Sequence, residues 1–410
     1  MDMLLVLFAL LVGLAGAYYV YDRQQKERAA EEAREAKRRQ QEEQELLLQQ
    51  KKQKAKPKKV DITAEMKKRH GADASHDIIR DDHPLLLHVL KGHKYGITSA
   101  AYSPNGRFIA TSSTDRTIRI YARDALGDAK AKPQQITLEY DHVSALSFSP
   151  DGRTLIAATV NGTIKLYQKL KIKPELVIEF AAEHKTDVHS IVMSDIGKWA
   201  TIATCASESD TDVKFWGLDG SLLQVANTNQ VTNYHCIGSK DNRFVAVAAY
   251  TPEVKIFEIT REKNGTFRRA QKVMSLQGHR TGVLDLAFNG SDTLPVNRVV
   301  TTCKDATIRV WDINVRYAQQ EDPKNIKTFK PNDTSKPLQS IDLSADGKLL
   351  VAARGHDLLF FSTTEGREYA LITDAFEDVI KRVAFSPAGD EVLVLGKNAK
   401  HVKVFKVPKP

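Results

Sequence analysis

The chain has 410 residues and a formal net charge of +9, from 60 Lys and Arg against 51 Asp and Glu. Hydrophobic residues make up 42% of it, which excludes a wholly disordered chain. Its three cysteines, Cys205, Cys236 and Cys303, have no paired or regular spacing. A disulfide scaffold and a cysteine-based zinc module are therefore excluded, and a reducing compartment is indicated.

The first segment is apolar. Residues 3–21 carry no charge, a length that crosses the roughly 30 Å hydrocarbon layer as one helix. A cleaved signal peptide is the alternative, but only Met1 and Asp2 precede the segment, without the expected Lys or Arg. Seven Lys and Arg follow within residues 22–39, which predicts that the rest of the chain is cytosolic. We therefore expect residues 1–21 to be an uncleaved transmembrane anchor.

Residues 22–84 are predicted to form a charged helical stalk and a basic linker. Strong helix formers dominate up to Lys56, with opposite charges four residues apart, as in Glu35 and Arg39. Without an apolar heptad seam, a solvated single helix is favoured over a dimeric coiled coil. Six lysines lie within residues 51–59. They suit a solvated linker, or a contact with anionic lipid headgroups or RNA phosphates.

Beyond residue 84 a repeat of about 47 residues appears, close to the length of a four-stranded propeller blade. Each repeat has a Ser-Pro-x-Gly-like turn, as at Ser103 and Ser149, and weaker forms begin at Ser239 and Asn289. A strand ending in an aromatic residue follows each turn. These residues are Tyr121, Tyr167, Trp216, Phe257, Trp311, Phe361 and Phe405. The pattern predicts an all-β, seven-bladed β-propeller over residues 85–407, closed by pairing of Leu85–Leu90 with the last blade.

Two of the repeats are specific enough to show a family resemblance. Gly92-His93 with residues 115–121, and Gly278-His279 with residues 304–312, resemble the WD repeat. The resemblance implies a buried hydrogen-bond relay of His, Ser or Thr, Asp and an aromatic residue, which stabilises a blade. Carried over residue by residue, the relays are His93, Ser112, Asp115 and Tyr121; His184, Ser207, Asp210 and Trp216; and His279, Thr302, Asp305 and Trp311. The other four blades depart from this pattern, and we expect apolar substitutes there.

Within this family, the anchor, the basic linker and the unusual fourth repeat resemble a member anchored in the endoplasmic reticulum (ER). That repeat contains Asn227-Thr228-Asn229-Gln230 and residues 251–257. The resemblance implies a single-pass ER membrane protein with a cytosolic propeller. It also implies protein partners that include a stress-sensing kinase of the unfolded protein response, and a link to RNA.

No sequence motif for catalysis is found. Nucleotide-binding glycine loops, a nucleophile elbow and a zinc-protease motif are all missing. His184 and His189 are better explained by a relay than by a metal site. We therefore predict a protein that is not an enzyme, with no catalytic residue, cofactor or metal.

Three functions compete. The leading one is a membrane-tethered scaffold that binds partner proteins, and the second is an RNA- or ribosome-binding protein at the cytosolic ER face. A nucleotide-exchange factor for a small GTPase is the third. Family members commonly bind partners where the loops before each blade's first strand converge. Counting from each turn places there His142, His189, Tyr234, Tyr250, Lys304, Arg354 and Lys381. Three cations beside two tyrosines would suit an acidic protein segment or a phosphate backbone.

Overall fold

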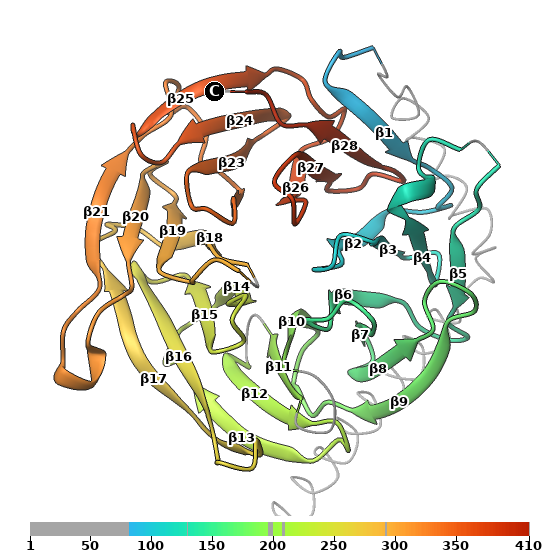
Figure 1. Cartoon of the computed structure of the whole chain (residues 1–410), viewed down its shortest axis with the longest axis horizontal. Helices are drawn as coiled ribbons and strands as arrows, with labels where there is room; N and C mark the ends of the chain where they lie inside the picture. Colours follow the sequence, from blue (N-terminus) through green and yellow to red (C-terminus); the bar gives the residue numbers. More distant parts are fainter. Residues whose placement is uncertain (1–81, 129, 196–199, 207–209, 292, 410) are drawn as a thin grey trace, which may run out of the picture. The chain divides into compact units, whose positions relative to one another are not determined.

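A computed structural model describes residues 82–409 except 129, 196–199, 207–209 and 292. These residues form seven four-stranded antiparallel sheets arranged as a ring (Figure 1). The predicted all-β, seven-bladed propeller is thereby confirmed. Among the described residues, helical structure is limited to short 3-10 turns such as η2 (Arg123–Ala125) and η4 (Tyr317–Gln319). The predicted anchor and nearly all of the predicted stalk and linker lie outside the described residues.

The innermost strand of each blade lies next to the ring axis in Figure 1. In blade order these strands are β2 (Ile97–Tyr102), β6 (Val143–Phe148), β10 (Val188–Ser194), β14 (Asn233–Gly238), β18 (Val283–Phe288), β22 (Ser340–Leu343) and β26 (Ile380–Phe385). The second strands are β3 (Phe108–Ser113), β7 (Leu155–Thr159), β11 (Thr201–Ala206), β15 (Phe244–Ala249), β19 (Arg298–Cys303), β23 (Leu349–Arg354) and β27 (Glu391–Gly396).

The third strands carry the seven predicted aromatic residues, all of them buried. They are β4 (Thr117–Ala122), β8 (Thr163–Gln168), β12 (Asp212–Gly217), β16 (Glu253–Arg261), β20 (Ile308–Asp312), β24 (Asp357–Ser362) and β28 (Val402–Lys406). The outermost strands are β5 (Gln134–Thr137), β9 (Glu175–Ala181), β13 (Leu222–Asn227), β17 (Phe267–Gln277), β21 (Lys324–Phe329), β25 (Arg367–Ile372) and β1 (Leu86–Leu90).

The ring closes as the sequence predicts. Strand β1 pairs antiparallel with β28 of the seventh blade, with Leu86 opposite Phe405. Blade seven is therefore built from both ends of the propeller, and closure removes two sheet edges that would otherwise be open.

The hydrophobic core lies between the blades. Seven clusters of buried apolar side chains occur, and each draws its members from two adjacent blades. The innermost strands are also tied by side-chain bonds. Asp285 Oδ2 accepts a hydrogen bond from the Ile341 backbone N–H of the next blade at 2.9 Å, and Asp342 Oδ2 accepts one from Phe385 N–H at 2.7 Å.

Because the strands alternate in direction, two kinds of loop meet at each end of the ring. The loops before the first strands and between the second and third strands lie at one end, here called the start face. The Ser-x-x-Gly turns and the loops before the outermost strands lie at the other end, here called the turn face. In the turns, the Ser hydroxyl accepts from a backbone N–H, as between Phe108 N and Ser103 Oγ at 2.8 Å.

Candidate partner-binding face and buried relays

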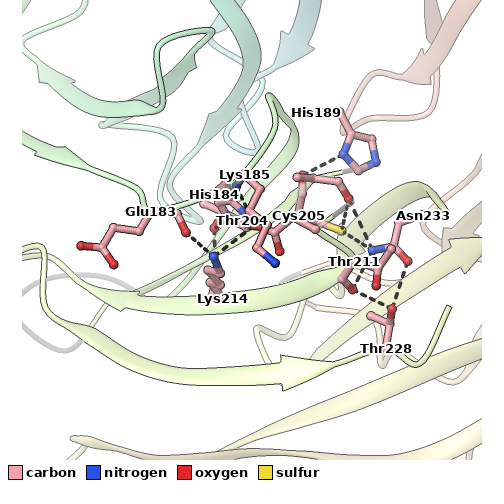
Figure 2. Close-up of polar contacts among 12 residues, drawn as sticks. Glu183, His184, Lys185, His189, Thr204, Cys205, Thr211, Lys214, Thr228 and Asn233 are labelled. Carbon is pink, nitrogen blue, oxygen red and sulfur yellow. Dashed lines mark hydrogen bonds and ion pairs between the residues drawn. The ribbon is translucent and has the colours of Figure 1, made fainter. Parts of the chain in front are cut away.

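Two blades contain the predicted His–Asp contact. In blade one, His93 Nδ1 lies 3.0 Å from Asp115 Oδ2, and its Nε2 lies 2.8 Å from Thr111 Oγ1. In blade three, His184 makes the same two contacts, with Asp210 at 3.0 Å and Thr204 at 2.7 Å. Figure 2 shows His184 beside Thr204.

The aromatic member completes the relay in blade three, where Trp216 Nε1 donates to Thr204 Oγ1 at 2.8 Å. The threonine hydroxyl then donates to His184 Nε2, and the Nδ1–H donates to Asp210. In blade one Tyr121 stands in the Trp position, and its hydroxyl donates to the Lys91 carbonyl at 3.3 Å instead.

Blade five has a modified relay. His279 Nε2 lies 2.7 Å from Thr301 Oγ1, which also accepts from Trp311 Nε1 at 2.8 Å. On the other side of the His279 imidazole, Nδ1 lies 3.3 Å from Thr307 Oγ1, and that hydroxyl donates to Asp305 Oδ1 at 2.5 Å. Thr307 is thus inserted between the histidine and the aspartate.

The predicted hydroxyl members are wrong by one position in two blades. Ser112 Oγ bonds Thr98 Oγ1 at 2.8 Å, while Thr111 occupies the relay. Thr302 Oγ1 is buried without a partner among the described residues, while Thr301 occupies the relay. Successive strand residues point to opposite faces of a sheet, so the hydroxyl must share the face of the aromatic residue. Ser207 lies outside the described residues, and Thr204 fills its place.

The relay histidines are buried and neutral. Burial lowers the pKa of His93 and His184, and the neighbouring Asp115 and Asp210 only partly oppose that effect. The pKa of His279 falls to about 4, because of burial and the positive charge of Arg309. A neutral imidazole that donates through one nitrogen and accepts through the other is what the relay requires. The relays stabilise the blades and leave these groups turned away from solvent.

The blades without a relay contain the expected apolar substitutes at the position of the relay hydroxyl, where the strand register places Ala157, Val247, Ala352 and Val394, all of them buried. Two of these blades also hold a buried lysine. In blade seven Lys403 is 1% exposed, and its ammonium lies 2.6 Å from Glu377 Oε1 and over the Phe376 ring. In blade four the buried Lys255 donates to the Thr228 carbonyl. These two buried charges have polar or charged partners, and the relay hydroxyl is replaced by an apolar residue, so both parts of the expectation hold.

On the start face, three of the predicted residues come together. The Lys304 ammonium lies 5.3 Å from the centre of the Tyr234 ring and 5.0 Å from that of Tyr250, within cation–π range. Blades four and five meet here through Gly282, where an added Cβ would lie 2.4 Å from the Tyr250 carbonyl oxygen. This close backbone approach brings the two blades together where Tyr234, Tyr250 and Lys304 form one group.

The other two predicted cations are engaged within the protein. Arg354 is buried and pairs with Asp357 at 3.2 Å and Asp333 at 3.4 Å. The Lys381 ammonium donates to the Thr98 carbonyl at 2.7 Å, and its burial lowers the lysine pKa. The predicted group of three open cations is therefore wrong, and Lys304 alone of the three presents an exposed ammonium.

The two predicted histidines differ. His142 is partly exposed, beside Asp141 at 4.0 Å. His189 lies deeper, where its Nδ1–H donates to the Cys205 carbonyl at 2.7 Å (Figure 2) and burial lowers its pKa to about 4. His189 is therefore a neutral structural residue, and His142 remains on the start face.

A polar cluster at the ring axis was missed in the sequence. His235 Nδ1 lies 2.6 Å from Asp285 Oδ1 in the next blade, and Arg382 of blade seven contacts His235 Nε2 from across the axis. All three occupy the third position of an innermost strand, where blades one and three have Ser99 and Ser190. A departure from small hydroxyl residues at that position is the signal that could have found it.

Comparison with known proteins places these features. The family model "WD domain, G-beta repeat" matches residues 85–122, 133–168 and 270–312, which lie in blades seven, one, two, four and five. Transducin beta-like protein 2 of Homo sapiens is 30% identical over 332 residues, covering 79% of this chain and 72% of that protein. The chain belongs to the WD-repeat family that includes transducin beta-like protein 2.

Two further relatives support the membership. The Mus musculus transducin beta-like protein 2 is 29% identical over 330 residues, again covering 79% of this chain and 72% of that protein. Elongator complex protein 2 of Dictyostelium discoideum is 20% identical over 240 residues, which is 52% of this chain and 26% of that protein.

As in other WD-repeat proteins, the start face has the features of an interaction surface. Five large apolar or aromatic side chains are exposed around it, and Tyr140 is the most exposed at 89%; they are Tyr95, Tyr140, Val231, Tyr250 and Val379. Among the described residues, no group of three or more His, Cys, Asp or Glu could hold a metal, and no helix is long and apolar enough to cross a membrane. WD-repeat propellers are generally non-catalytic scaffolds, and the face described here suits protein binding.

Proposed function

We propose that this protein is a non-catalytic scaffold, tethered to the ER membrane with its propeller in the cytosol. The start face binds partner proteins, and the Tyr234–Lys304–Tyr250 group lies within that binding surface. Tethering holds partners at the membrane at a raised effective concentration. By its resemblance to ER-anchored relatives, the scaffold acts in stress signalling, with a stress-sensing kinase of the unfolded protein response among its partners.

One observation carries the protein-binding part of this proposal. The start face exposes aromatic and branched apolar side chains around a tyrosine pair, and such residues dominate binding at protein interfaces. RNA binding is less well supported, because Arg354 and Lys381 are engaged with protein groups and the face has few open cations. The tether is supported by the uncharged residues 3–21 and the basic residues after them.

A face-directed variant tests the proposal. The full chain carrying Tyr140→Ser, Val231→Ser and Tyr250→Ser is captured from crosslinked membranes, with and without RNase, and its partners are quantified by mass spectrometry. The control carries Ile326→Ser and Leu371→Ser, two exposed apolar residues on the outermost strands and away from the start face. Exposed substitutions usually change stability by no more than about 0.5 kcal/mol each, so both variants should fold.

We expect the start-face variant to lose partners that survive RNase, by at least tenfold, while the control keeps them. Equal capture by both variants would contradict the assignment of the binding face. Partners that disappear on RNase treatment of the unmodified protein would instead favour the RNA-binding alternative.

A further inference from the structure

The loop between β8 and β9 exposes an isoleucine among lysines. Ile172 is 83% exposed at the tip of this loop, with Lys171 and Lys173 on either side and Lys169 before them. A large aliphatic side chain so open to water has no structural role in the blade. Lysines that flank an exposed apolar tip are the pattern of a segment that contacts a charged bilayer interface.

The apolar surface continues from this loop onto the ring's outer edge. Leu176 and Val177 on β9 are exposed, as are Leu222 and Leu223 on β13 of the next blade. One groove is lined by residues of both strands, so the two exposed stretches belong to a single surface. In Figure 1, β9 and β13 lie next to each other along the outer edge of the ring.

Two acidic residues of this surface are paired with lysines, and the third, Asp219 in the groove, accepts from the Ser221 hydroxyl. Glu175 is bound by Lys169 at 2.8 Å and Glu179 by Lys165 at 2.7 Å. Lys171 and Lys173, by contrast, are exposed and have no ion pair among the described residues. Two more exposed lysines, Lys130 and Lys132, lie in the corresponding loop of blade one, also on the turn face. The net character of this corner is therefore cationic and apolar.

We propose that the corner formed by the Lys169–Lys173 loop and the exposed residues of β9 and β13 rests on an anionic lipid bilayer. Ile172 inserts into the interface, and the lysines contact lipid phosphates and carboxylates. Anionic lipid is favoured over RNA because the loop has an aliphatic tip and no aromatic residue on which a base could stack. Each lysine near such a surface strengthens partitioning by roughly fivefold.

Membrane contact at this corner is compatible with partner binding at the start face. The loop lies on the turn face and at the outer edge, whereas Tyr140 and Tyr250 lie on the start face. A propeller resting on this corner would leave the start face open to cytosolic partners. The inference stands on the chemistry of the loop, and it holds whether or not residues 3–21 anchor the chain.

A fluorescent probe at position 172 tests this contact. The natural cysteines Cys205, Cys236 and Cys303 are buried, so Ile172→Cys provides a selective labelling site in the full chain. The protein, labelled with an environment-sensitive dye, is mixed with or reconstituted into vesicles of phosphatidylcholine alone or with 30% phosphatidylserine (a proportion on the order of that in anionic leaflets). Lipids carrying a nitroxide near the headgroup report insertion by quenching the dye. Val231→Cys, on the start face, is the matched control site.

We expect quenching and a blue-shifted emission at position 172 with anionic vesicles, and little change at position 231. Adding Lys171→Glu and Lys173→Glu should weaken the response roughly 25-fold or more, because two lysines at fivefold each are lost. Unchanged thermal unfolding would show that the variant is folded.

Three results would overturn the inference. They are no quenching at position 172, equal quenching with neutral vesicles, and quenching that is unaffected by the two charge reversals. A dye response that requires added RNA or a partner protein would reassign the corner to that ligand, and it would also overturn the lipid assignment.

Discussion

At the scale of single residues, two adjacent threonines in blade five differ in role, because one hydroxyl belongs to the relay and the other does not. Thr301 Oγ1 accepts from Trp311 and bonds His279, whereas Thr302 Oγ1 is buried without a described partner. Thr301→Val should therefore lower the free energy of unfolding by about 1–3 kcal/mol, because it leaves two buried polar groups unsatisfied. Thr302→Val should be nearly neutral or stabilising. Urea denaturation of both variants decides the matter, and equal losses would contradict the relay as described.

A second residue-scale prediction concerns acid. The pKa of His279 is lowered to about 4 from an ordinary value of about 6.5, so the unfolded chain binds this proton more tightly. The contribution of neutral His279 to the free energy of unfolding is fully present above pH 6.5. It is lost as the pH falls toward 4, by up to about 1.4 kcal/mol per pH unit. The free energy of unfolding should fall between pH 7 and pH 5. His279→Gln should reduce that slope, whereas Thr302→Val, which removes no titratable group, should leave it unchanged. An unaltered slope in His279→Gln would exclude the histidine as the source.

The sequence predicted some site residues well and others poorly, for physical reasons. The His, Asp and Trp members of the relays are recognisable because they occur in fixed loops and strand ends. The hydroxyl member depends on which face of the second strand a residue occupies, and adjacent threonines make that choice ambiguous. The pairing of Arg354 with Asp333 joins residues 21 apart across two loops. Loop conformation decides that contact, so spacing alone counted Arg354 as an open cation.

At the scale of elements, blade seven contains a buried ion pair where other blades have a relay. Lys403→Met should lower the free energy of unfolding by about 3–5 kcal/mol, because Glu377 is left as an uncompensated buried charge. The double variant Lys403→Met with Glu377→Gln should recover much of that loss. Thermal and urea unfolding measure both variants, with Lys406→Met as a control at an exposed lysine on the same strand. Additive losses in the double variant would show that the two side chains are not coupled.

The strands themselves were predicted unevenly. The three inner strands of each blade carry the turn, the buried apolar run and the terminal aromatic residue, which made the repeat visible. The outermost strands have one free edge and one exposed side, so their sequences share no common pattern and range from the apolar Leu86–Leu90 to the polar Gln134–Thr137. The composition of residues 314–336, rich in Lys, Asn, Asp and Pro, predicts a surface loop, yet they include η4 and the whole of β21. That prediction was wrong because Lys324–Phe329 has the composition of a loop and becomes a strand only by pairing with β20.

At the scale of the whole molecule, closure of the ring makes the stability of the propeller depend on both ends of its chain. The core consists of seven inter-blade clusters, and the cluster between blades seven and one contains residues from both ends of the described chain, such as Leu90 and Val404. Separating the strands and blades at this closure would expose two sheet edges and two apolar blade faces at once. The polar groups at the axis add to the coupling, because Arg382 of blade seven reaches His235 of blade four. The ring should therefore unfold as a unit, with no blade stable alone.

The orientation of the chain in a membrane gives a further prediction at this scale. Four N-x-Ser/Thr sequons lie in the propeller, at Asn161, Asn264, Asn289 and Asn332. Three of these side chains are exposed, whereas Asn289 is 4% exposed and its Oδ1 accepts from Arg298 N–H at 2.7 Å. A cytosolic propeller never meets the glycosylation machinery, so the natural protein should carry no N-linked glycan although three sites are accessible.

A lumenal control shows whether these sites are competent. Replacing residues 1–21 with a cleavable signal peptide should direct the propeller into the ER lumen, where glycans should be added at Asn161, Asn264 and Asn332. Asn289→Gln should change nothing in that background, because its side chain is folded into the turn. The measurement is the gel mobility of both proteins before and after endoglycosidase treatment. An endoglycosidase-sensitive shift of the natural protein would place the propeller in the lumen. The cytosolic partners proposed here would then lie on the opposite side of the membrane, and the proposal would be contradicted.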